Sequence, residues 1–196
     1  MSRLVCLVTF LAAALLGAAA MDATQSSKAV PYSPPFKWAV NSPLNAQVST
    51  AYAGQWATAV QGGAWDWYYR TDLEVIPTSA QITEIYAHDA FSIDYPPGWA
   101  TAYSNNYTCL TYPNYFSGNC NMTTEAATTG VIDLNDFYFD SDASYNQMVA
   151  AHELGHVFGL NHGACANTRI MEPPCYPTPH PLTTTAQDIS DVATVY

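Results

Sequence analysis

Basic residues are scarce in this chain of 196 residues, which has 5 Lys and Arg against 16 Asp and Glu and a formal net charge of −11. Nucleic acids and anionic membranes are bound mainly through Lys and Arg side chains. We therefore expect neither of them as a partner. The acidity fits a solvated surface that keeps a protein soluble.

Cysteine is also scarce, and no two cysteines have the CxxC spacing that is typical of zinc ligands. The sequence contains no internal repeat, no coiled-coil heptads and no glycine-rich nucleotide-binding loop. With 49% hydrophobic residues, the chain is long enough for one domain with a core and too short for a second large domain.

The longest hydrophobic run covers residues 4–20, follows Arg3 and ends in small residues. This pattern predicts a secretory signal peptide over residues 1–20. The alternative is an uncleaved membrane anchor, for which the run is at the short end of the usual length. We expect a secreted protein with a leader or linker at residues 21–35 and one folded domain at residues 36–196.

Four cysteines remain once Cys6 leaves with the signal peptide. An even number in a secreted chain predicts two disulfide bonds, for which three pairings are open. The two pairs that are close in sequence are favoured: Cys109 with Cys120, and Cys165 with Cys175. Asn106 and Asn121 begin two N-x-Thr triplets, which predict glycosylation if the host is eukaryotic.

Residues 152–162, HELGHVFGLNH, form the most specific pattern in the chain. His152 and His156 are four residues apart, so on a helix both imidazoles project from one face. Gly159 can adopt the left-handed conformation that ends a helix, so that His162 approaches the same point from outside. Three neutral imidazoles with one open position predict a catalytic zinc site, because a structural site would have a fourth protein ligand.

Glu153 lies beside the first histidine, where it can reach a water on the metal and act as a general base. HExxH alone also occurs by chance in helices that bind nothing. The extended pattern fixes five positions and includes three of the 5 histidines. A chance match is expected only on the order of 10⁻⁵ times in such a chain.

The pattern HExxHxxGxxH is the signature of the metzincin metalloendopeptidases. By itself Met171 would be interpreted as a core residue. Its segment Arg169-Ile170-Met171-Glu172-Pro173 resembles the methionine turn of the matrixin branch. Residues 188–196 resemble the end of matrixin catalytic domains. Two features differ: Gly163 stands where matrixins usually carry Ser or Thr, and the tyrosine of the astacin methionine turn is absent.

This resemblance implies a zinc-dependent endopeptidase whose catalytic domain spans residues 36–196. One Zn²⁺ on the three histidines would activate water, Glu153 would move its proton to the leaving amine, and Met171 would lie under the metal. A protein or peptide substrate is implied, and we expect a monomer; calcium binding is left open. The alternative is a secreted binding protein or pseudoenzyme of the same fold, whose expected sign would be the loss of Glu153. A purely structural zinc domain would need a fourth ligand.

His88-Asp89 raises the alternative of a second metal site, since matrixins hold a structural zinc with three histidines and an aspartate in this region. Outside the motif the sequence has only His88 and His180. That site therefore cannot be built in the family's form. We interpret His88 as a surface residue and expect no second zinc.

The predicted elements favour an α+β domain. Apolar spacing predicts a helix over about 46–63, and the aromatic residues at 65–69 are interpreted as core and rim packing. Capping boxes are predicted at Ser144 with Gln147 and at Thr184 with Gln187. Strands are predicted over 36–40, 73–76, 82–87, 100–108 and 131–139, the fourth as an edge strand beside the active site. Metzincins combine a twisted five-stranded mixed sheet, an active-site helix and a small C-terminal subdomain, and we expect this fold here.

Overall fold

The computed structural model describes residue 38 and residues 44–81, 83–104, 108–110, 117–119, 126–163, 168–172 and 181–196. The predicted signal peptide and leader therefore lie outside the described residues. None of the helices in the described part is long and apolar enough to cross a membrane.

The main sheet has four parallel strands and one antiparallel strand. The parallel strands are β1 (Asn45–Tyr52), β2 (Glu74–Thr78), β3 (Ile85–Ala90) and β7 (Thr129–Asn135), and the antiparallel strand is β4 (Gly98–Tyr103). A short hairpin of β5 (Thr108–Leu110) and β6 (Ser117–Asn119) extends the sheet to the order β2-β1-β3-β7-β4-β5-β6. The predicted five-stranded mixed sheet and α+β class are confirmed, with two three-residue strands in addition.

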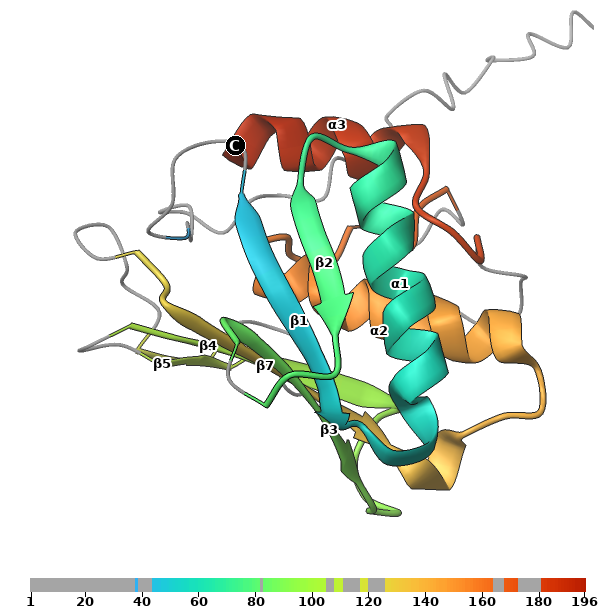
Figure 1. Cartoon of the computed structure of the whole chain (residues 1–196). Coiled ribbons are helices and arrows are strands. Elements are labelled where there is room, and N and C mark those ends of the chain that lie inside the picture. Colours follow the sequence, from blue (N-terminus) through green and yellow to red (C-terminus); the bar gives the residue numbers. More distant parts are fainter. Residues whose placement is uncertain are drawn as a thin grey trace, which may run out of the picture.

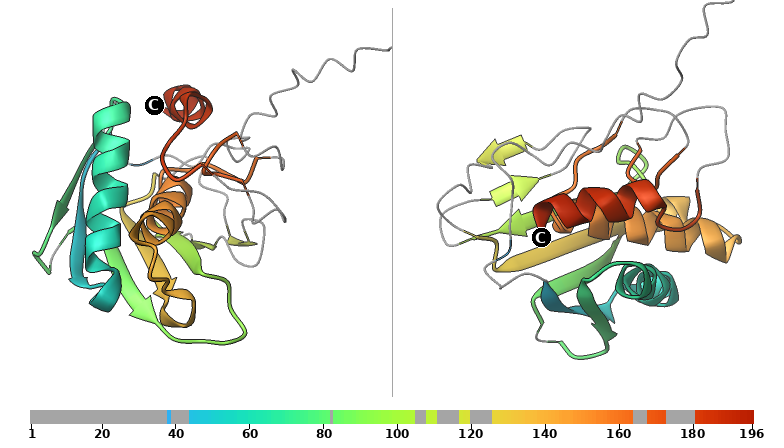
Figure 2. Two further views of the ribbon diagram at one scale, coloured as in Figure 1. Left: turned by 90° about the vertical axis from the view of Figure 1, so that its right-hand side faces the viewer. Right: turned by 90° about the horizontal axis from the view of Figure 1, so that it is seen from above.

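Three α-helices complete the domain: α1 (Ala57–Arg70), α2 (Ala143–Val157) and α3 (Ala186–Val195). Helices α1 and α2 lie on the same side of the sheet and contact each other, and α3 lies above them in the view of Figure 1. The views in Figure 2 show α2 between the sheet and α3. The helix that carries the histidine motif is thus enclosed by the other layers.

The prediction of a helix over 46–63 was wrong at its start. The segment Asn45–Tyr52 is a strand between β2 and β3, and after the 3-10 turn η1 (Gly54–Trp56) the helix runs from Ala57 to Arg70. Ala46 and Val48 are buried while Asn45 and Gln47 are exposed, which is the two-residue alternation of a strand. The helical spacing of the same apolar residues was coincidental.

Other predicted strands shift by a few residues. β3 begins at Ile85, β7 ends at Asn135 before the 3-10 turn η2 (Asp136–Tyr138), and β4 runs from Gly98 to Tyr103. The strand β4 is not the edge of the whole sheet, because β5 pairs with Thr101–Tyr103. Of the predicted first strand, only Trp38 is described, and it forms an isolated bridge with Ala127.

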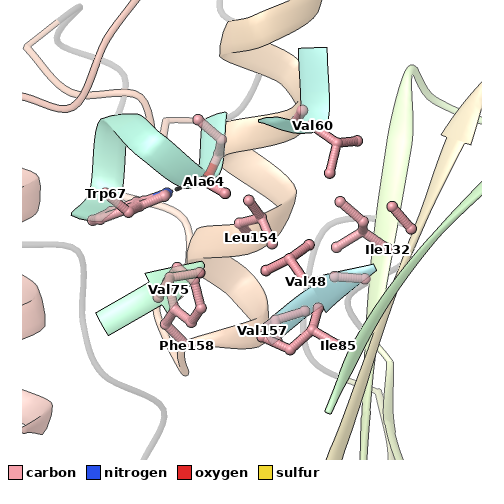
Figure 3. Close-up of a cluster of buried hydrophobic side chains, with 14 of the residues drawn as sticks. Val48, Val60, Ala64, Trp67, Val75, Ile85, Ile132, Leu154, Val157 and Phe158 are labelled. Carbon is pink, nitrogen blue, oxygen red and sulfur yellow. Dashed lines mark hydrogen bonds between the residues drawn. The ribbon is translucent and has the colours of Figure 1, made fainter. Parts of the chain in front are cut away.

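The core lies between the sheet and helices α1 and α2, and Figure 3 shows side chains from both layers meeting there. Trp67 is fully buried, donates a hydrogen bond to the Ala151 carbonyl at 2.8 Å and packs edge-on against Phe158. Trp38 donates to the Val157 carbonyl at the end of α2, also at 2.8 Å. The Trp67 indole thus joins α1 to α2, and the Trp38 indole joins the end of α2 to the segment that bridges with Ala127. Trp67 is thus part of the core and Tyr69 is exposed, as predicted for the aromatic residues at 65–69.

Gly63 permits the close approach of α1 to α2, although the sequence predicts that the helix ends there. A Cβ atom at Gly63 would lie 2.8 Å from the backbone nitrogen of Ala151, and that backbone cannot move aside cheaply. A Cβ at Gly62 would meet only the Gln147 side chain. The absence of a side chain at Gly63 therefore sets how closely α1 packs on the helix of the histidine motif.

We expect Gly63→Ala to destabilise the protein by about 1–3 kcal/mol, because the added methyl group forces the two helices apart. This loss should outweigh the gain in helix propensity of about 1 kcal/mol. Urea unfolding measures the change. The matched control is Gly62→Ala, which has the same propensity gain and meets only a flexible side chain. Equal stability of the two variants would contradict this interpretation.

Candidate metal centre

The N-cap of helix α2 lies two residues before the predicted one. The Asp142 carboxylate accepts a hydrogen bond from Ser144 N at 2.9 Å, so Asp142 is the N-cap, and the predicted box of Ser144 with Gln147 was wrong. Aspartate and serine cap helices about equally well, so the sequence alone does not decide which of the two residues caps α2. At α3 the predicted box is also displaced by one residue, because Thr185 and Asp188 form it.

Gly159 ends α2 as the sequence predicts. Its φ of 89° lies in the left-handed region that favours glycine. Gly159 N donates to the His156 carbonyl at 2.9 Å, and Leu160 N donates to the Gly155 carbonyl at 3.0 Å. These bonds satisfy carbonyls at the helix end and turn the chain back, so that His162 faces the last turns of α2.

The structure brings the three histidines of the motif together. The Nε2 atoms of His152, His156 and His162 form a triangle with sides of 3.0, 3.1 and 3.1 Å. Tetrahedral zinc with bonds of about 2.0–2.1 Å holds its nitrogen ligands about 3.3 Å apart. The triangle has almost this size, so the three imidazoles can hold a metal ion.

The outer nitrogens of two rings are bonded to backbone carbonyls. His152 Nδ1 bonds the Ile170 carbonyl at 2.5 Å, and His156 Nδ1 bonds the Leu160 carbonyl at 2.8 Å. A carbonyl can only accept, so each Nδ1 must carry the proton, and each Nε2 presents a lone pair to the centre of the triangle. Lone pairs that point at one another repel, and a cation between them removes the repulsion.

Burial lowers the pKa of His156 well below its usual value, and the nearby His152 and His162 lower it further. The hydrogen bond to the Leu160 carbonyl opposes this change. His156 is therefore neutral in the folded protein at neutral pH. A neutral imidazole is the form that binds zinc.

Glu153 is buried beside the histidines. Burial raises its pKa to about 8, and the negative charge of Asp133 adds to the increase. Its Oε2 atom has no hydrogen-bond donor within the described part of the chain. An unsatisfied buried carboxylate oxygen is costly in a purely structural role and is often functional. The raised pKa makes the ionised carboxylate a stronger proton acceptor than a solvent-exposed glutamate.

The first residue of β4 lies directly against Glu153. A Cβ atom at Gly98 would be 2.7 Å from Glu153 Cγ and 3.0 Å from its Oε1. The strand can therefore pass over the carboxylate only because residue 98 is glycine. Nothing in the sequence predicts this contact.

Met171 lies under the histidine helix. It is fully buried, and its sulfur fills the space in which Gly155 lacks a side chain. Its carbonyl accepts a hydrogen bond from Gly163 N at 2.7 Å, which joins the segment to the residue after His162. The methionine turn of the sequence is thus placed next to the three histidines.

Asp188 holds this segment from α3. Its carboxylate accepts hydrogen bonds from the backbone N–H groups of Ile170 at 3.1 Å and Met171 at 3.3 Å, and also from Thr185. Burial raises the pKa of Asp188, and these hydrogen bonds oppose the rise. Since the Ile170 carbonyl in turn orients His152, Asp188 supports the metal centre from outside it.

Gly163 departs from the usual matrixin residue, and the structure gives a reason. A Cβ at Gly163 would lie 2.8 Å from Cδ and 3.0 Å from Nη1 of Arg169. The Arg169 side chain is fully buried and forms an ion pair of 3.1 Å with Asp191, which is also buried. The arginine therefore fills the room that a side chain at residue 163 would need.

His88 lies on strand β3 and is not part of the histidine triangle. It forms a pair with Asp133 at 3.6 Å and an edge contact with Tyr52. In the described part of the chain, the three motif histidines are the only group of three or more His, Cys, Asp or Glu that can hold a metal. His180 lies outside the described residues.

Several predicted sites fall outside the described part of the chain. These are Cys120, Cys165, Cys175, Asn106 and Asn121, and only the backbone of Cys109 is described. The disulfide pairing and the glycosylation therefore stay predictions.

The sequence of residues 41–196 matches the matrixin family. No curated protein sequence matches the chain. The family match covers both halves of the metal centre, the histidine helix and the methionine segment, together with the sheet that supports them. With a match over most of its length, the chain belongs to the matrixin family.

Proposed function

We propose that this protein is a secreted zinc-dependent endopeptidase. The observation that carries the proposal is the triangle of Nε2 atoms with sides of 3.0 to 3.1 Å, in a chain of the matrixin family. His152, His156 and His162 would hold the zinc. The buried carboxylate of Glu153 would serve as the general base.

A zinc ion in this place would supply Lewis acidity, which polarises a scissile carbonyl and acidifies water. Glu153 would accept the proton of the attacking water and deliver it to the leaving amine. The burial that raises its pKa would make the ionised carboxylate a strong proton acceptor, and a cation on the three histidines would favour that ionised form. The Ile170 and Leu160 carbonyls would keep the rings of His152 and His156 in their ligand orientation.

Other parts of the proposal rest on the sequence. Cleavage of residues 1–20, a catalytic domain over 36–196, two disulfide bonds and a monomeric state are predictions that biochemical analysis of the mature protein can check. A polypeptide substrate follows from the family of the chain. Zinc is the cofactor that three histidines of this geometry favour.

We expect the purified protein to retain one zinc ion per chain after dialysis against buffered chelator, and to hydrolyse a denatured protein between acidic and neutral pH. A strong chelator should abolish the hydrolysis, and added Zn²⁺ should restore it. Elemental analysis and a quenched peptide library provide the two measurements. Hydrolysis that survives removal of the metal would contradict the proposal. Two tightly held zinc ions would contradict the prediction of a single site.

A further inference from the structure

Large apolar side chains are exposed where β3 leads into β4. We call these residues the loop surface: Phe91, Ile93 and Tyr95 from the β3–β4 connection, and Phe137 and Tyr138 from η2. The exposed fractions of Phe91, Ile93 and Phe137 are 72%, 65% and 51%. The rings of Phe91 and Phe137 lie 6.1 Å apart, and those of Phe137 and Tyr138 lie 5.1 Å apart. Exposed apolar groups that gather in this way mark interaction sites.

The backbone of the loop surface is held from below by Asn135, which is fully buried. The Asn135 amide nitrogen donates to the carbonyls of Ser92, Tyr95 and Pro96 at 2.7, 3.2 and 3.1 Å. Its oxygen accepts from Ser92 N at 3.0 Å. The loop is therefore fixed with its apolar side chains outward, and binding would cost little further ordering of its backbone.

The loop surface lies next to the proposed catalytic site along the chain. Asn135 N donates to the Pro97 carbonyl at 2.9 Å, and the next residue is Gly98, whose Cα lies against Glu153. A polypeptide with its scissile bond at Glu153 would therefore have the loop on one side of the site. On the other side of the site, the substrate would lead away from the loop along β4.

The charge of the surroundings limits what can bind. The sequence holds no Lys or Arg between Arg70 and Arg169, while Asp89, Asp94 and Asp136 stand in or beside the loop surface. An acidic partner would be repelled, and nothing in this segment would pair with its carboxylates. The complementary occupant is an extended polypeptide with apolar side chains and no net negative charge.

We propose that the loop surface is a second binding site for the substrate, which takes apolar side chains on one side of the scissile bond of an unfolded polypeptide. This inference rests on the proposed function, because the occupant is the substrate itself. It assigns the substrate class: unfolded, neutral or basic chains with apolar segments several residues from the cleaved bond.

The test variant combines Phe91→Ser with Ile93→Ser. The control is Tyr69→Ser, which replaces an aromatic residue on α1 whose side chain is 76% exposed. The substrates are a short quenched peptide that the wild type cleaves and two longer forms, extended by about ten residues of Leu, Phe and Gln on either side, long enough to reach past the loop. For one of the two extensions, the test variant should have a KM about tenfold above that of the wild type, which corresponds to about 1.4 kcal/mol. The kcat of the test variant for that extended peptide should equal that of the wild type. Its kcat and KM for the short peptide should also stay unchanged.

A binding measurement separates this inference from the proposed function. The same replacements are made in a Glu153→Ala protein, and binding of fluorescent, reduced and alkylated lysozyme is followed by anisotropy. The Kd should rise about tenfold with Phe91→Ser and Ile93→Ser and stay unchanged with Tyr69→Ser.

Equal Kd and KM values for the test and control variants would overturn the proposal. So would a change in sedimentation that shows the loop surface to be a contact between two copies of the chain. If the wild type hydrolyses nothing, the endopeptidase function fails, while the Kd values still decide whether the loop surface binds unfolded chains.

Discussion

Replacing Glu153 by alanine should lower peptide hydrolysis by about 10²- to 10⁴-fold while the fold and the bound zinc are retained. The Nε2 triangle is made by the three histidines alone, and the Nδ1 atoms of His152 and His156 are held by backbone carbonyls. Removing the carboxylate leaves these contacts in place. It also removes a buried group with an unsatisfied oxygen, so the variant should not be less stable.

The measurement is kcat/KM on a quenched peptide, with zinc content and circular dichroism on the same samples. His156→Ala serves as the comparison, because it should lose both zinc and activity. A Glu153→Ala protein that holds zinc and cleaves at the wild-type rate would remove Glu153 from the mechanism. A wild type that holds zinc but cleaves nothing across the pH range would favour the binding-protein alternative.

Asp191→Ala should destabilise the protein by about 3–5 kcal/mol, because it leaves the buried guanidinium of Arg169 without its ion-pair partner. Both side chains are fully buried, and their ion pair measures 3.1 Å. Nε and Nη2 of Arg169 have no other acceptor in the described part of the chain, which adds to the cost. Urea unfolding of metal-free protein measures the loss directly.

A double variant, Arg169→Met with Asp191→Leu, separates the charge from the packing. It removes both charges while keeping apolar volume, and we expect it to recover most of the stability lost in Asp191→Ala. Asp72→Ala, at an exposed position, should stay within about 0.5 kcal/mol of the wild type. If Asp191→Ala is as stable as Asp72→Ala, the ion pair does not hold the methionine segment.

The sequence predicted the features that depend on local spacing. Two histidines four apart on a helix must share a face, and a glycine three residues later allows the chain to turn, so the approach of His162 follows from short-range geometry. The fold class followed from the resemblance of the motif and is confirmed by the sheet and the family match. These predictions needed no knowledge of contacts between distant residues.

The features that were missed depend on residues far apart in the chain. β1 was interpreted as a helix because its apolar residues satisfy both periods, and only its position between β2 and β3 makes it a strand. Gly98 and Glu153 are in contact although they are 55 residues apart in the chain. Asn135 was predicted only as part of a strand over 131–139, while in the structure its side chain binds the carbonyls of a loop some 40 residues earlier.

Because α3 supports the candidate metal centre, the order of synthesis decides when this site is complete. Asp188 fixes Ile170 and Met171, and the Ile170 carbonyl orients His152. During synthesis on the ribosome, the histidine helix α2 emerges before its support α3. The arrangement of the candidate metal centre is therefore completed only after α3 has been synthesised and has docked on the segment around Met171.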